Sequence, residues 1–194
     1  AADFANSLKI TTSDAINPLY TSIGIRKAWP EEQDQAVVYL YLIASAQDLK
    51  TYIESLDDFI ATFPNASEGY TQRASYKAHN RFALSPDDAA GQLNLLNSAK
   101  EDMETALKLS TEDKGDILYG YAKMIYEVAV TDSTQAANGW TDDAALYMLE
   151  RAITEKDMPV YRQLQADILF NQGKYDSAYE NYIAVCHSDA ASPA

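Results

Sequence analysis

Small and large apolar residues recur along the chain at intervals of three and four residues, with polar residues between them. Such intervals place the side chains on one face of an α-helix. The pattern therefore predicts amphipathic helices wherever it is sustained. It is plainest at Tyr52, Leu56 and Phe59; at Ala99, Met103 and Ala106; at Ala145, Leu149 and Ala152; and at Ala178, Tyr182 and Val185.

A partner helix is predicted before each of these segments, over 33–47, 67–80, 114–130 and 157–172. Ser67 follows Pro64-Asn65-Ala66 as a helix cap, and Pro159 stands in a first turn, where its missing N–H costs little. Gly173 can take the left-handed conformation that ends one helix and turns the chain into the next. Ser85-Pro86-Asp87-Asp88 predicts the start of a long helix over 86–109.

The spacing of the segments predicts a repeat of antiparallel helix hairpins. Ala99, Ala145 and Ala178 are separated by 46 and 33 residues, which suits a hairpin repeat of roughly 34 residues with one expansion. We therefore expect an all-α protein with a single helical domain over 1–194. Its hairpins are expected at 33–64, 67–109, 114–155 and 157–187.

The two ends of the chain are predicted less fully. One or two helices precede the hairpins: a helix over 15–28 ends at Pro30, and an alternative repeat phase through Tyr20, Ile23 and Gly24 stays open. After His187, the segment SDAASPA looks like a turn into a further repeat. Helical arrays usually finish with a polar-faced capping helix, and the sequence contains none. We therefore expect this chain to be a segment of a longer array.

Composition agrees with helices joined by short turns and excludes several partners. Of the 194 residues, 47% are hydrophobic, and the net charge of −14 argues against nucleic acid or an anionic membrane. No apolar run is long enough to insert into a membrane. The opening AADFANSLKI lacks a secretory signal, and a signal removed earlier would leave no trace. Both a cytoplasmic and a bacterial extracytoplasmic setting stay open.

The sequence lacks the motifs that carry common chemistry: GxGxxG, GxxxxGK[ST], GxSxG, HExxH and CxxC do not occur. Residues 132–143 have the length of a calcium loop, but Ala136 and Ala137 occupy a ligand position and the required glycine. The single cysteine, Cys186, is expected in the core. Paired acids occur at Asp57-Asp58, Asp87-Asp88 and Asp142-Asp143, and the last two pairs suit helix starts. We therefore expect no enzyme activity, no cofactor and no metal.

The residues around the Gly173 turn resemble the tetratricopeptide repeat family. The family has a small residue in its first helix, a glycine and a tyrosine at the turn, and an alanine and an aromatic in its second helix. Ala166, Gly173, Tyr175, Ala178 and Tyr182 match these positions in order. The likeness covers roughly 33–187 and implies a right-handed α-solenoid, a superhelix of hairpins. The chain departs from the family at Arg162, at Val185 and in its longer links, 82–90 and 131–140.

In the family that these residues resemble, the first helices of the hairpins line a concave groove that binds peptides. Lys, Asn and Arg clamp a terminal carboxylate in its chaperone-binding members, but Thr71, Ser75 and Asp167 stand here instead. Carried onto this chain, the groove positions are Glu68, Thr71, Ser75, Ala78 and His79; Asp116, Tyr119, Lys123, Tyr126 and Glu127; and Val160, Gln163, Asp167, Phe170 and Asn171. For Tyr119 and Phe170, packing between hairpins is an equal alternative.

We therefore expect a non-catalytic scaffold that binds another protein or a peptide. The alternative is an architectural segment that helps a larger chain assemble or associate with itself. The segment FIATFPNASEGY faintly resembles repeats of bacterial envelope-assembly lipoproteins, which favours that setting for the alternative. The sequence leaves the partner's identity and the oligomeric state open.

Overall fold

The computed structural model describes residues 48–190, and this part of the chain is helical, with no strand. The all-α fold is therefore confirmed for these residues. The helices expected over 15–28 and 33–47 lie outside the described residues, as does the end of the expected C-terminal turn. The contacts divide the chain into two compact units, Ala1–Ala66 and Ser67–Ala194. The expectation of one continuous domain over 1–194 stays a prediction.

The described part of the first unit is the helix α4, Leu49–Thr62. Asp48 caps it, because its carboxylate accepts a hydrogen bond of 2.9 Å from the backbone N–H of Thr51. Leu56, Phe59 and Phe63 form a small buried cluster, with the two phenyl rings 5.2 Å apart. Leu56 and Phe59 belong to the apolar face predicted from the sequence, and Phe63 follows the end of the helix. The spacing of apolar residues within this segment therefore accounts for the helix.

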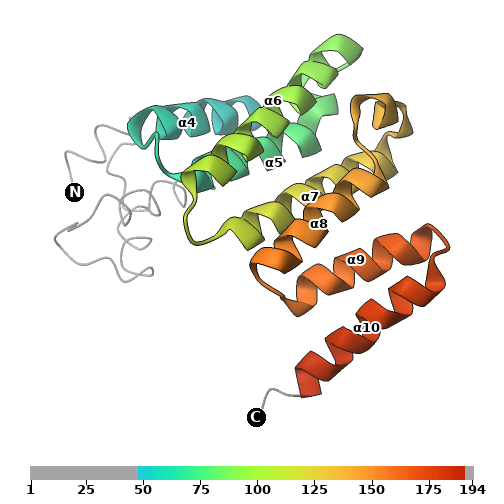
Figure 1. The fold of residues 1–194 in the computed structure, drawn as a ribbon. Helices are drawn as coiled ribbons and strands as arrows, with labels where there is room; N and C mark the ends of the chain where they lie inside the picture. Colours follow the sequence, from blue (N-terminus) through green and yellow to red (C-terminus); the bar gives the residue numbers. More distant parts are fainter. Residues whose placement is uncertain (1–47, 191–194) are drawn as a thin grey trace. The chain divides into compact units, whose positions relative to one another are not determined.

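The second unit consists of helices that pack most extensively in consecutive pairs, α5 with α6, α7 with α8, and α9 with α10. We call α5, α7 and α9, the first members of these pairs, the first helices. They run in the same direction, and α7 contacts both α5 and α9 (Figure 1). The bounds are α5 Ser67–Leu84, α6 Ala89–Leu109, α7 Lys114–Thr131, the 3-10 helix η1 Ser133–Asn138, α8 Asp142–Glu155, α9 Pro159–Asn171 and α10 Tyr175–Ala190.

Caps and turn residues set most of these bounds. Thr141 accepts from the N–H of Ala144 at 3.1 Å and starts α8. Gly173, with a φ of 75°, makes the turn between α9 and α10 as predicted. Helix α6 is shorter than expected, beginning at Ala89 rather than at 86. Asp88 is its N-cap and Asp87 has a left-handed φ of 56°, so both belong to the turn.

Buried alanines line the interfaces within the helix pairs. Each helix can approach its neighbour closely where a methyl group replaces a larger side chain, and the large residues beside it fill the space on either side. Leu96, Met103 and Leu149 fill space in this way and are at most 2% exposed. The most completely buried alanines are Ala74, Ala78, Ala99, Ala106, Ala122, Ala145, Ala152, Ala166 and Ala178.

The long link between α7 and α8 is folded onto α6 rather than open. Trp140 at its end is 1% exposed, and the ammonium of Lys100 on α6 lies 4.6 Å from its ring centroid. The same ammonium donates a 2.8 Å hydrogen bond to the carbonyl of Asn138. Burial lowers the pKa of Lys100. The predicted link thus belongs to the packed structure of this unit.

A buried ionic cluster joins α5 to α6. The Asp102 carboxylate accepts hydrogen bonds from Arg73, at 2.9 Å from Nε and 2.5 Å from Nη2, and from Lys77 Nζ at 3.1 Å. Lys77 also donates to the Ser98 hydroxyl at 2.8 Å. The side chains of Arg73, Lys77 and Asp102 are only 18%, 11% and 7% exposed. One buried carboxylate therefore binds two cations.

We expect Asp102→Ala to destabilise the second unit by about 3–5 kcal/mol, because a largely buried carboxylate that accepts hydrogen bonds from both Arg73 and Lys77 would be lost. The neighbouring Glu101→Ala is the control, since the side chain of Glu101 is exposed. Urea unfolding followed by circular dichroism measures both changes. Equal free energies of unfolding for the two variants would show that the ionic cluster does not hold the hairpin.

We expect glycine-to-alanine substitution to have opposite effects on stability at Gly120 and at Gly173. A Cβ added to Gly120 or to Gly173 meets nothing within 4 Å, but Gly120 lies inside α7 and Gly173 has a φ of 75°. Gly120→Ala should stabilise the unit by about 0.5–1 kcal/mol, and Gly173→Ala should destabilise it by about 1–2 kcal/mol. Thermal or urea unfolding compares the two, and a shared sign would contradict the assigned backbone conformations.

Candidate functional site

The residues predicted to line the groove are distributed over the first helices α5, α7 and α9, which contact one another in sequence. The structure gives these residues two different roles. Some of them meet across the helix–helix contacts, and others pack inside or between hairpins. The predicted residues are Glu68, Thr71, Ser75 and His79 on α5; Asp116, Tyr119, Lys123 and Tyr126 on α7; and Gln163, Asp167, Phe170 and Asn171 on α9.

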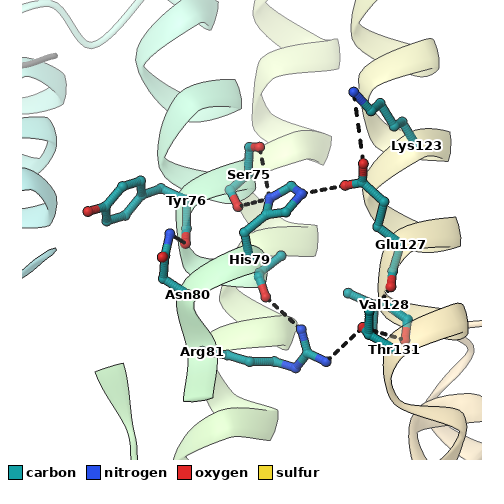
Figure 2. Close-up of polar contacts among 10 residues, drawn as sticks. Ser75, Tyr76, His79, Asn80, Arg81, Lys123, Glu127, Val128 and Thr131 are labelled. Atoms are coloured by element: carbon teal, nitrogen blue, oxygen red, sulfur yellow. Dashed lines mark hydrogen bonds and ion pairs between the residues drawn. The ribbon is translucent and has the colours of Figure 1, made fainter. Parts of the chain in front are cut away.

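Ser75, His79, Lys123 and Glu127 form what we call the α5–α7 seam (Figure 2). His79 Nε2 contacts the Glu127 carboxylate across the two helices. On the other side of the ring, Nδ1 lies 2.6 Å from the backbone carbonyl of Ser75. Lys123 Nζ lies 3.8 Å from the same glutamate. The seam therefore combines one carboxylate with two basic side chains and a hydroxyl.

Below the seam, the buried Arg81 makes a second polar link from α5 to the end of α7. Its guanidinium donates to the carbonyl of Ala78 at 2.8 Å and to the Thr131 hydroxyl at 3.3 Å (Figure 2). Asp132 lies 3.8 Å away. Burial lowers the pKa of Arg81, whereas hydrogen bonds from Thr134 lower the pKa of Asp132. The lowering at Asp132 favours its charged form, whereas Arg81 stays protonated at neutral pH because a guanidinium is an exceptionally strong base.

The contact between α7 and α9 continues this pattern. The side-chain amide of Asn171 donates a 2.7 Å hydrogen bond to the hydroxyl of Tyr126. Tyr126 also packs against the hydrophobic core, so its ring is held while its hydroxyl reaches the next hairpin. Together with His79 and Glu127, these residues form a row of polar contacts across the three first helices. The structure thus brings Ser75, His79, Lys123, Tyr126 and Asn171 into this row.

Asp116 and Tyr119 pack between hairpins instead. The hydroxyl of Tyr161 on α9 donates to Asp116, and Lys156 lies 3.9 Å from the same carboxylate. Tyr119 stacks on the Tyr161 ring with centroids 5.0 Å apart. Burial, with the hydrogen bond to Asp116, raises the pKa of Tyr161. For Tyr119 the alternative of packing between hairpins describes its position.

Asp167 and Phe170 contact the second helix of their own hairpin. Asp167 accepts a 2.6 Å hydrogen bond from Tyr182 on α10, which raises the pKa of Tyr182 to about 12. Phe170 is 53% exposed and lies edge-on to Tyr175, 5.2 Å away. Neither residue is part of the polar row.

The remaining predicted residues have less specific surroundings. Thr71 donates to the backbone carbonyl of Glu68 at 2.9 Å, a contact within α5. Glu68 and Gln163 are exposed. These three residues line the helices without joining them.

Sequence reasoning did not predict the link from Arg81 to Thr131 and Asp132. The signal for it is an arginine close to the inward-facing alanines Ala74 and Ala78, since a buried guanidinium requires acceptors. Without knowledge of the helix pairing, its acceptors could not have been chosen among the many acids of the chain.

Two of the paired acids lie at helix starts, and the cysteine lies on the surface. Asp88 caps α6, and Asp142 and Asp143 lie in the first turn of α8, where burial raises the pKa of Asp142. Cys186, expected in the core, is exposed. The expectation was wrong because α10 packs mainly against α9, so most of its outer surface has no neighbour among the described helices.

No protein-family model and no curated protein matches this chain. Within residues 48–190, no cluster of His, Cys, Asp and Glu side chains is suited to hold a metal ion. No helix of this part combines the length and apolar character needed to cross a bilayer. The functional argument therefore depends on the polar row and its surroundings.

Asp132 offers a pH-dependent test of the Arg81 link. Its pKa is lowered from 3.8, so its contribution to stability is present at neutral pH and is lost as the pH falls through the folded-state pKa. We expect Asp132→Asn to cost about 1–2 kcal/mol at neutral pH, because a buried guanidinium loses its counter-charge. Urea unfolding from about pH 7 to pH 3 should show this difference shrinking below about pH 4. Because hydrogen bonds from Thr134 are the largest cause of the lowered pKa, a difference that is constant with pH would contradict the contacts of Asp132 with both Thr134 and Arg81.

Proposed function

We propose that residues 67–190 form a right-handed solenoid of tetratricopeptide-like hairpins whose first helices bind a short segment of another protein. The observation that carries the proposal is the row of polar contacts across α5, α7 and α9, running from Ser75 and His79 through Glu127 and Tyr126 to Asn171. Such a row supplies fixed donors and acceptors over three neighbouring helices. A peptide lying across them would find hydrogen-bonding groups at successive positions.

The side chains of the row are partly exposed, so their hydrogen bonds to one another can be replaced by hydrogen bonds to a peptide. The side chains of His79, Lys123 and Glu127 are 46%, 55% and 35% exposed. Their mutual hydrogen bonds satisfy them in the free protein, and each can exchange one for a bond to a peptide at small net cost. A groove built from such groups remains soluble without a ligand and still offers specific contacts.

Exposed apolar side chains lie close to the polar row. Phe82, Val130 and Phe170, near the C-terminal ends of α5, α7 and α9, are 48%, 65% and 53% exposed. Exposed large apolar residues beside hydrogen-bonding groups are typical of binding surfaces, where they supply most of the affinity. They favour a partner segment that carries apolar side chains as well as backbone hydrogen bonds.

The architectural alternative is favoured by one other observation. Tyr175, Tyr179 and Ile183 recur every fourth residue along α10 and are 62%, 66% and 36% exposed. Residues at this interval share a helix face, so α10 presents an apolar strip outward. Such a strip suits association with another protein surface.

The test is to select binders from a random peptide library on the full chain and to measure their affinities for variants. Lys123→Glu reverses a charge on the row and places a carboxylate beside Glu127. We expect it to weaken the selected peptides by at least about 10-fold, or about 1.4 kcal/mol. Lys108→Glu is the matched control, since Lys108 is exposed in the last turn of α6, which is the second helix of its hairpin.

Equal effects of Lys123→Glu and Lys108→Glu would contradict the proposed groove. The architectural alternative makes a different prediction: sedimentation equilibrium should show self-association of the chain, and Tyr179→Lys should abolish it. A chain that yields no peptide binders but does associate in this way would replace the first proposal with the second.

A further inference from the structure

The ring of His79 faces a hydrogen-bond acceptor on each side. Nδ1 lies 2.6 Å from the backbone carbonyl oxygen of Ser75, and Nε2 contacts the carboxylate of Glu127. A carbonyl oxygen and an ionised carboxylate only accept, whereas a neutral imidazole carries a single N–H. Both contacts are therefore hydrogen bonds only when the ring is protonated on both nitrogens. The α5–α7 seam therefore has all of its hydrogen bonds only when His79 is an imidazolium ion.

The neutral ring loses one of the two bonds whichever tautomer it takes. With the proton on Nδ1, the bond to the carbonyl is kept and a lone pair on Nε2 faces the carboxylate. With the proton on Nε2, the bond to Glu127 is kept and the lone pair faces the carbonyl. The Ser75 hydroxyl, 3.3 Å from Nδ1, can then donate to that nitrogen. The first tautomer loses the link from α5 to α7, and the second keeps it as a hydrogen bond from a neutral ring, which is weaker than the bond from an imidazolium ion.

We propose that His79 and Glu127 form a proton-operated clasp between the hairpins α5–α6 and α7–α8. The clasp is closed when His79 is an imidazolium ion and loosens when the ring is neutral. Histidine is the residue type that proteins use as a protonation switch. Both side chains are partly exposed, at 46% and 35%, so protons exchange freely with solvent.

The charged groups around the clasp are consistent with this assignment. From α7, Glu127 is the carboxylate that contacts the ring, and Lys123 is the cation that shares it at 3.8 Å. From α6, the charge presented to α5 is Asp102, and Arg73 and Lys77 bind it. On α5 itself, Arg81 is directed to Thr131 and Asp132 at the end of α7. Glu127 is therefore the carboxylate that protonation of His79 engages.

The clasp lies between two hairpins, so its loss affects how they pack against each other. The contacts between α5 and α7 are less extensive than those inside either hairpin. The polar links described between these two helices are the clasp and the buried Arg81 link, and of the two only the clasp contains a histidine. Loss of the clasp should therefore loosen one hairpin against the next without unfolding either.

A double-mutant cycle at two pH values tests the proposal on the full chain. His79→Gln, Glu127→Gln and the double variant are unfolded in urea at about pH 5.5 and pH 8. We expect a coupling between the two positions of about 2- to 5-fold in the unfolding equilibrium constant at the lower pH, as for a partly exposed ion pair, and a smaller coupling at the higher pH, where a neutral ring can still donate one hydrogen bond to Glu127. The coupling therefore decreases as the pH rises, because the imidazolium ion is the form of His79 that makes both hydrogen bonds.

His187→Gln is the matched control, because His187 is the other histidine of the chain and is exposed near the end of α10. It should leave the coupling unchanged. A coupling that is equal at both pH values, larger at pH 8 or absent at both would overturn the proposal.

A measurement on the unmodified protein covers the case in which the variants fold poorly. In ¹H–¹⁵N spectra of the histidine rings at about pH 5.5, both ring nitrogens of His79 should have the ¹⁵N chemical shifts of protonated nitrogens. A His79 ring that carries a single N–H at that pH would overturn the proposal independently of the variants.

Discussion

The close approach of paired helices at buried alanines is the constraint on which the rest of the second unit depends. Alanines such as Ala99 and Ala152 are fully buried between helices, and large residues such as Leu96 and Leu149 fill the space beside them. A larger side chain at such a position would force the helices apart at a cost of about 1–3 kcal/mol. Because the pairs are held in one arrangement, each first helix presents a defined face to the next.

Polar contacts then set how one hairpin meets its neighbour. Apolar packing is non-directional, so it joins hairpins without specifying their register. The contacts of His79 with Glu127, Arg81 with Thr131 and Asn171 with Tyr126 are directional and occur between successive first helices. Among these groups, His79, Glu127, Tyr126 and Asn171 are ones that we propose to meet a partner segment. Register and recognition therefore share side chains, which is the physical reason that proton binding at His79 would affect both.

Much of the secondary structure could be predicted because its signals are local. The glycine turn at Gly173 and the alanine faces lie within a few residues of the elements that they define, whereas the start of α6 was expected at 86 and is at Ala89, after the N-cap Asp88. Other features depend on distant residues and could not be predicted in this way. Asp167 contacts Tyr182 rather than the row, Arg81 is buried beside Thr131, and Cys186 is exposed because its helix has one main neighbour. Side-chain direction at such positions is decided by tertiary packing, which the sequence periodicity does not specify.

The most direct test of this account is a set of nuclear Overhauser contacts between successive first helices in the full chain. The account predicts contacts from the His79 ring to the Glu127 side chain and from the Asn171 side chain to the Tyr126 ring. Contacts between Asp167 and Tyr182 serve as the reference inside one hairpin. If the contacts inside the hairpin appear and both contacts between hairpins are absent, the hairpins do not stack in the described register and the proposed binding face does not exist.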